Sequence, residues 1–144
     1  MVGRVCRGKA VVVRPLNSIV RLHADVMKGA KKPSAKLFVG RWRISSMEQW
    51  DRDYIDLVVP GHITIKNKGL GHFQFGTAAG SIDYRIESHP DGERLEFSWY
   101  GEIEMDLTSG RGWATVQGNE LRGRLFVHMG DDSWFIAKKE TRAI

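Results

Sequence analysis

The sequence predicts an all-β protein, an antiparallel up-and-down barrel of about eight strands with a short helix near the N-terminus. From Leu37 almost to the C-terminus, apolar and polar residues alternate, which is the period of a half-buried strand. The breaks between these runs are rich in Gly, Pro and Asp, as in tight hairpin turns. No break is long enough for the crossover that parallel strands need. A long meander is expected to close, because closure removes its exposed edges.

The chain of 144 residues divides into a basic arm, residues 1–36, and a single barrel domain, residues 37–144. Behind an Asn17-Ser18 cap, apolar residues recur at three- and four-residue spacing as far as Ala30. This predicts a short amphipathic helix. A packed helix, a frayed arm and, more weakly, an organelle transit peptide all fit this segment.

Charge is unevenly divided between these two parts. The arm contains nine lysines and arginines and one acid, whereas the barrel segment contains thirteen basic and sixteen acidic residues. The net charge of +5 therefore comes from the arm, and it does not indicate a nucleic-acid groove on the barrel.

The alternating runs define the expected strands in order. Their apolar positions are Phe38, Trp42 and Ile44; Ile63 and Ile65; Phe73 and Phe75; Ile82, Tyr84 and Ile86; Leu95, Phe97 and Trp99; Ala114 and Val116; Leu125 and Val127; and Phe135 and Ala137. The expected turns are "PGH" from residue 60, "NKGLG" from 67, "TAAG" from 77, "HPDG" from 89, "QGN" from 117 and "MGDDS" from 129.

Aromatic residues gather on the inner face that this alternation defines. An eight-stranded barrel has room inside for side chains or for one small ligand. We therefore predict that six aromatic residues form the wall of a site for an apolar or amphipathic ligand. They are Trp42, Phe73, Phe75, Tyr84, Phe97 and Trp99.

The triplet Gly40-Arg41-Trp42, followed by "SSMEQWD", resembles the opening of calycin-type barrels such as lipocalins. In that superfamily the Trp lies under one end of the barrel, and a basic residue from a late strand packs across it. The resemblance implies that Arg122, Arg124 or Lys138 has this role, and we add Arg124 to the predicted ligand-binding residues.

A second resemblance covers residues 37–139. The blocks "GRWRISSMEQWDRDYIDL", "GHFQFG", "FSWYGEIEMD", "SGRGWA" and "GDDSWF" look like those of a family of small, uncharacterised bacterial proteins. This resemblance implies a bacterial origin and carries no activity with it.

Residues that could carry chemistry are scattered. His62, His72 and His128 lack the short spacing of a metal site, so we predict surface histidines, no metal and no cofactor. The single cysteine, Cys6, excludes an internal disulfide, and we expect a reduced, cytoplasmic location. No apolar run is long enough to span a membrane.

Two further motifs leave alternatives open. Gly110 and Gly112 are expected where the chain turns or closely approaches another backbone, and Arg111 between them could instead clamp an anion. The acids Glu102, Glu104 and Asp106 are expected in solvent, with a weak carboxylate-based enzyme as the alternative.

The favoured function is a noncatalytic small-molecule-binding barrel. The alternative is a structural or protein-interaction module, in dimeric form, that uses an outward stripe of Phe126, Trp134 and Ile136. Less favoured are the weak enzyme and a nucleic-acid binder using Arg41, Arg43, Arg122 and Arg124.

Overall fold

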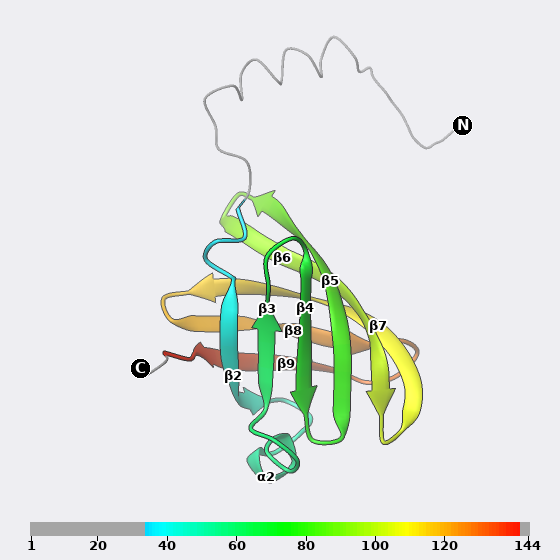
Figure 1. Ribbon diagram of the computed structural model, residues 1–144. Coiled ribbons are helices and arrows are strands. Elements are labelled where there is room, and N and C mark those ends of the chain that lie inside the picture. Colours follow the sequence, from blue (N-terminus) through cyan, green and yellow to red (C-terminus); the bar gives the residue numbers. More distant parts are fainter. Residues whose placement is uncertain (1–33, 142–144) are drawn as a thin grey trace, which may run out of the picture. The chain divides into compact units, whose positions relative to one another are not determined.

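Eight strands, each antiparallel to its neighbours, form a closed barrel in the computed structural model (Figure 1). The structure describes residues 34–141, so the predicted N-terminal helix and Cys6 lie outside the described residues. The elements are β2 (Gly40–Met47), α2 (Arg52–Ile55), β3 (His62–Ile65), β4 (Leu70–Phe75), β5 (Ala78–His89), β6 (Gly92–Ile103), β7 (Asp106–Gln117), β8 (Glu120–Val127) and β9 (Asp132–Lys139). The predicted eight-stranded, up-and-down barrel is confirmed.

The barrel closes where β2 pairs with β9, in a register that places Trp42 opposite Lys139. The Lys139 ammonium lies 4.7 Å from the centroid of the Trp42 ring and donates to the Val39 carbonyl at 2.6 Å. A basic residue from the last strand therefore covers the tryptophan, as expected, but the predicted candidates were wrong. Lys139 has the inward phase of Phe135 and Ala137.

The candidates named for that role, Arg122, Arg124 and Lys138, lie on the opposite phase of their strands and face solvent. Because side chains alternate across a strand, a residue one position away points to the other side of the sheet. The alternation of β9 would have selected Lys139 over Lys138.

Most of the expected turns are confirmed, one differs, and one further turn was not expected. "TAAG" is not a turn: Gly76 and Thr77 make the turn, and β5 already begins at Ala78. The turn between β6 and β7 was not predicted, because it contains neither Gly nor Pro. Glu104 and Met105 adopt φ values of +52° and +72° there, as a tight two-residue hairpin requires.

Glycines inside the barrel make room for aromatic rings. A Cβ atom at Gly112 would collide with the Phe97 ring and lie 2.6 Å from the Arg124 carbonyl oxygen. At Gly110 it would collide with the Phe126 carbonyl oxygen and lie 2.7 Å from the Trp99 indole nitrogen. The predicted close approach at these two glycines is thus confirmed, and it is an approach within β7 and not a turn.

We expect Gly112→Ala to lower the free energy of unfolding by about 3 kcal/mol, because the added methyl group overpacks the ring of Phe97. Gly118→Ala is the control: its Cβ meets nothing within 4 Å, and only its φ of +67° opposes alanine, at a cost of about 1 kcal/mol. Urea denaturation followed by tryptophan fluorescence measures both. Adding Phe97→Leu should recover part of the loss in Gly112→Ala. Equal losses in the two alanine variants would contradict the steric explanation.

Candidate functional site

The six predicted wall residues lie inside the barrel as expected, where they belong to one cluster of buried hydrophobic residues. Trp42, Phe73, Phe75, Tyr84, Phe97 and Trp99 are each 6% exposed or less. Their rings pack on one another: the centroids of Phe73 and Phe75 are 5.8 Å apart, and those of Phe73 and Trp99 are 5.1 Å apart. Such distances are those of direct aromatic contact. These residues form the core of the protein.

The polar groups of the tyrosine and the two tryptophans in this set are hydrogen-bonded to backbone carbonyls. The Tyr84 hydroxyl donates to the Lys66 carbonyl at 2.5 Å, and the Trp42 indole N–H donates to the Phe38 carbonyl at 2.8 Å. The Trp99 indole N–H donates to the Phe126 carbonyl at 3.2 Å. Each of these three buried donors thus already has a backbone acceptor, as buried polar groups usually do.

Arg124, the seventh predicted ligand-binding residue, lies on the outer face of β8, apart from the other six. Its guanidinium is 3.0 Å from Asp132 and 3.4 Å from Glu48. In the sheet register it stands between Trp113 of β7 and Trp134 of β9.

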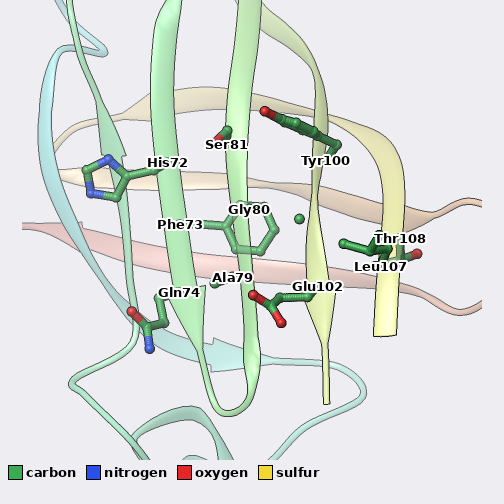
Figure 2. A pocket seen from close by; sticks show the side chains of 11 residues that line it. His72, Phe73, Gln74, Ala79, Gly80, Ser81, Tyr100, Glu102, Leu107 and Thr108 are labelled. Carbon is green, nitrogen blue, oxygen red and sulfur yellow. The ribbon is translucent and has the colours of Figure 1, made fainter. Parts of the chain in front are cut away.

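A hollow of about 710 Å³ lies on the outer face of the sheet over β5 (Figure 2). Ala79 and Ser81, on β5, present short side chains to it, whereas the neighbouring strands carry longer ones. The residues that line this "β5 hollow" are His72, Phe73, Gln74, Ala79, Gly80, Ser81, Tyr100, Gly101, Glu102, Leu107 and Thr108. Of the predicted site residues, Phe73 alone belongs to it.

The sheet register explains the shape of the β5 hollow. Ser81 lies between His72 of β4 and Tyr100 of β6, and Ala79 lies between Gln74 and Glu102. Small residues on the middle strand and long ones on both sides produce a trough along β5. The side of the trough formed by β6 and β7 is unusually apolar for a surface: Tyr100 is 64% exposed and Leu107 is 91% exposed.

Two histidines form the β3–β4 side of this face. The rings of His62 and His72 meet edge to face, with centroids 5.5 Å apart, and His62 Nδ1 is 3.1 Å from the Pro60 carbonyl oxygen. Burial lowers the pKa of His62, and burial followed by the neighbouring His62 lowers the pKa of His72. Both shifts favour the neutral form of the imidazole.

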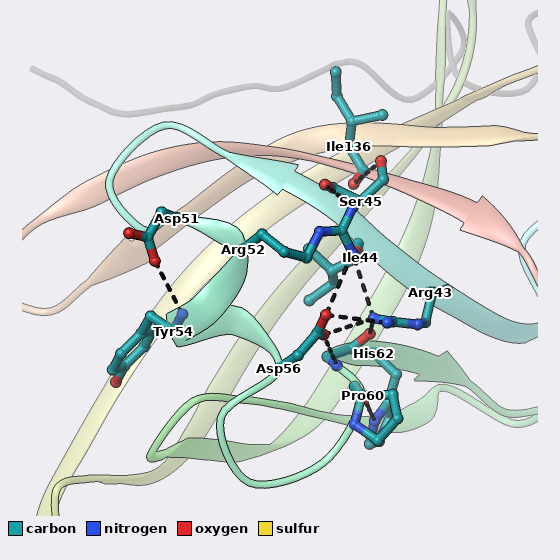
Figure 3. A network of polar contacts seen from close by, with 11 residues as sticks. Arg43, Ile44, Ser45, Asp51, Arg52, Tyr54, Asp56, Pro60, His62 and Ile136 are labelled. Atoms are coloured by element: carbon teal, nitrogen blue, oxygen red, sulfur yellow. Dashed lines mark hydrogen bonds and ion pairs between the residues drawn. The ribbon is translucent and has the colours of Figure 1, made fainter.

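A polar network at the end of the barrel near α2 has a structural role (Figure 3). Arg43 makes a two-point ion pair with Asp56, at 2.7 and 3.1 Å. Gly61 N–H also donates to Asp56, at 2.9 Å. The hydrogen bond from Arg43 holds the pKa of the Asp56 carboxyl well below its usual range. Together these contacts tie β2 to the segment that leads into β3.

The arginines considered for nucleic-acid binding are all paired with acids. Arg41 is 3.2 Å from Glu140, and Arg122 is 2.8 Å from Glu120, while Arg43 and Arg124 have the partners described above. These pairs neutralise the patch on which phosphate binding would depend. Arg111, the candidate anion clamp, stacks on the Phe126 ring at 4.8 Å, in a hollow that also contains Asp131 and Asp132.

Within residues 34–141, no three metal-ligating side chains gather closely enough to hold an ion. In the same part of the chain, no helix has the length and apolar character needed to cross a membrane.

Comparisons with known proteins identify little. No family model matches the sequence, and no curated protein matches it. Among solved structures, the chain is similar to the crystal structure of apo lipid binding protein 8 (LBP-8) from Caenorhabditis elegans. The identity is 15% and the TM-score 0.43, over 76% of this chain and 100% of that chain. Membership of the bacterial family that the sequence resembles stays a prediction.

We expect the free energy of unfolding to fall as the pH drops below about 6.5, the ordinary histidine pKa. In the unfolded chain His62 and His72 have ordinary pKa values, whereas in the folded protein both values are lowered. The unfolded state therefore binds protons first, and stability decreases with acidification until the folded-state pKa values are reached. Urea midpoints measured from pH 7.5 to 5 test this.

His62→Gln should make that decrease smaller, since one of the two buried imidazoles is gone. His128→Gln, which removes an exposed imidazole from the turn between β8 and β9, is the control for loss of a histidine in general. The burial explanation is wrong if both variants change the pH dependence equally.

Proposed function

We propose that the protein is a noncatalytic binding module that holds a small amphipathic ligand in the β5 hollow. The observation that carries this proposal is the contrast between the two sides of the sheet. Inside, buried rings pack on one another and the Tyr84 and Trp99 polar groups are hydrogen-bonded, whereas the outer face has a hollow of about 710 Å³. This volume is in the range of small-molecule sites, which measure about 300–1,000 Å³.

The lining suits a ligand with an apolar body and a polar end. Tyr100 and Leu107 offer apolar surface that no other described residue covers, and burying it would contribute about 25 cal/mol for each Å² removed from water. Gln74, Ser81 and Glu102 supply hydrogen-bonding groups at the sides. This combination of apolar surface and a few polar groups is typical of ligand sites.

The arrangement does not favour catalysis. The two groups able to act as base and acid, His72 and Glu102, stand on β4 and β6, with β5 between them. Two strand spacings separate such residues by about 10 Å. Side chains this far apart do not hydrogen-bond to each other, so neither activates the other as a base activates a nucleophile, which requires about 3 Å.

Filling the β5 hollow should abolish binding. We expect Ala79→Trp to weaken the binding of the neutral fluorescent amphiphile N-phenyl-1-naphthylamine at least about tenfold, because the indole occupies the trough; tenfold corresponds to about 1.4 kcal/mol. Ser98→Trp is the matched control, since Ser98 is an exposed, small outer residue of β6 that does not line the hollow. Fluorescence titration gives the affinities.

Amide chemical shifts locate the bound probe. Shifts confined to β4, β5, β6 and the start of β7 are expected in the wild-type protein. The proposal fails if the wild-type protein does not bind the probe, if Ala79→Trp binds it as well as Ser98→Trp, or if the shifts lie elsewhere.

A second candidate function, self-association, is favoured by the outer face of β7, β8 and β9. Trp134 is 38% exposed and lines a hollow of about 370 Å³ together with Trp113, Arg124 and Ile136. Tryptophan and arginine are the residues most enriched where protein interfaces derive their affinity. Because each arginine here has an acid beside it, the face can match the charges of a second copy of itself, as a two-fold dimer requires.

We expect the sedimentation coefficient of the wild-type protein to rise with concentration, and Trp134→Glu to remain a monomer. Leu107→Glu, which places a charge in the β5 hollow and outside the hollow that Trp134 lines, should associate like the wild-type protein. Analytical ultracentrifugation distinguishes these cases. A wild-type protein that is monomeric at its highest soluble concentration, or a dimer lost only in Leu107→Glu, would exclude this interface.

A further inference from the structure

The chemistry of the β5 hollow also indicates which amphipathic ligand it takes. We infer that the hollow selects a cationic amphiphile, with an ammonium or guanidinium head against Glu102 and an aromatic or aliphatic body over β5. This inference rests on the proposed function, because it assigns a ligand class to the same hollow.

The first step is the direction of the two long side chains of β6. Figure 2 shows Tyr100 and Glu102 extending from β6 toward β5, with the phenol end on the side of Ser81 and the carboxylate on the side of Ala79. The carboxylate thus lies at the β6 side of the trough. A head group seated over Ala79 would meet it directly, while the rest of the ligand lies along Tyr100 and Leu107.

The second step is the charge of the lining. Glu102 is the one Asp, Glu, Lys or Arg residue among those that line the β5 hollow, and the lowered pKa of His72 favours its neutral form. Among the described residues, no ion pair or hydrogen bond engages the Glu102 carboxylate. Glu104, in the adjoining turn, and Asp106, the first residue of β7, add negative charge at the same end and form no described ion pair.

The third step is the placement of the nearby cations. Arg41 and Arg43 are already paired with Glu140 and Asp56 on the far side of the histidines. Lys66 stands at the end of β3, where it influences His72 but does not line the hollow. An anionic head in the trough would therefore meet repulsion without a compensating cation, and a cationic head would meet an unpaired carboxylate.

The Tyr100 ring strengthens the preference. An exposed phenol ring attracts a cation over its face, by an amount comparable to an exposed ion pair. Acting together on a partly solvated head group, the two contacts correspond to about a fivefold preference for a cation over a neutral ligand of the same shape. The preference should weaken with salt, because the site is open to solvent.

Three indole derivatives with one body and different heads test this inference: tryptamine (cation), tryptophol (neutral) and indole-3-propionate (anion). For the wild-type protein we expect tryptamine to bind about fivefold more tightly than tryptophol, and indole-3-propionate to bind most weakly. Affinities come from amide-shift titrations, which also report whether each probe sits in the β5 hollow.

Glu102→Gln should remove the preference for tryptamine while leaving the affinity for tryptophol unchanged, because the amide keeps the shape of the carboxylate. Glu87→Gln, which makes the same change of net charge at an exposed position near the other end of β5, should keep the preference. Equal binding of all three probes in the hollow would overturn the inference and leave the proposed function standing, as would a preference that survives in Glu102→Gln. If no probe shifts the amides of the hollow, both fail.

Discussion

The packing of the aromatic rings inside this barrel depends on glycines in neighbouring strands, where a larger residue would occupy the space of the rings. On β7, the missing side chain of Gly112 leaves space for Phe97, and that of Gly110 leaves space for Trp99. On β5, Gly80 leaves space for Phe73. Because the interior of an eight-stranded barrel is narrow, this fit leaves the rings in contact with one another. The aromatic rings and the glycines that face them therefore form one packed core.

Small residues on β5 also shape the outer surface of the barrel. Gly80 has no side chain on the inner face of β5, and Ala79 and Ser81 have short side chains on its outer face. This part of β5 therefore projects little on either side of the sheet. Inside, the neighbouring rings fill the space; outside, nothing among the described residues does. The β5 hollow is therefore the outer counterpart of the packing inside, and its walls are set by what β4 and β6 place on either side.

Sequence periodicity predicted the strands, their order and their inner faces, because burial on one side of a strand produces a period of two. It could not distinguish an aromatic lining from an aromatic core, since both place Phe97 and Trp99 inward. The β5 hollow was missed for another reason. It depends on the cross-strand register between His72, Ser81 and Tyr100, and the turn that continues this face, at Glu104 and Met105, carries no glycine or proline signal.

The pairing of β2 with β9 brings the first and last strands of the barrel side by side, and Glu140 N–H donates to the Arg41 carbonyl. Every strand of the barrel therefore has two neighbours, and the strand pairs do not depend on which strand comes first in the chain. In a circular permutant, a short linker would join β9 to β2, and the new chain ends would lie at the exposed Gly118–Asn119 turn. This permutant would keep the same set of strand pairs. In that permutant β4, β5, β6 and β7 stay contiguous, so the barrel could carry a fused domain at β8 without interrupting the face that holds the β5 hollow.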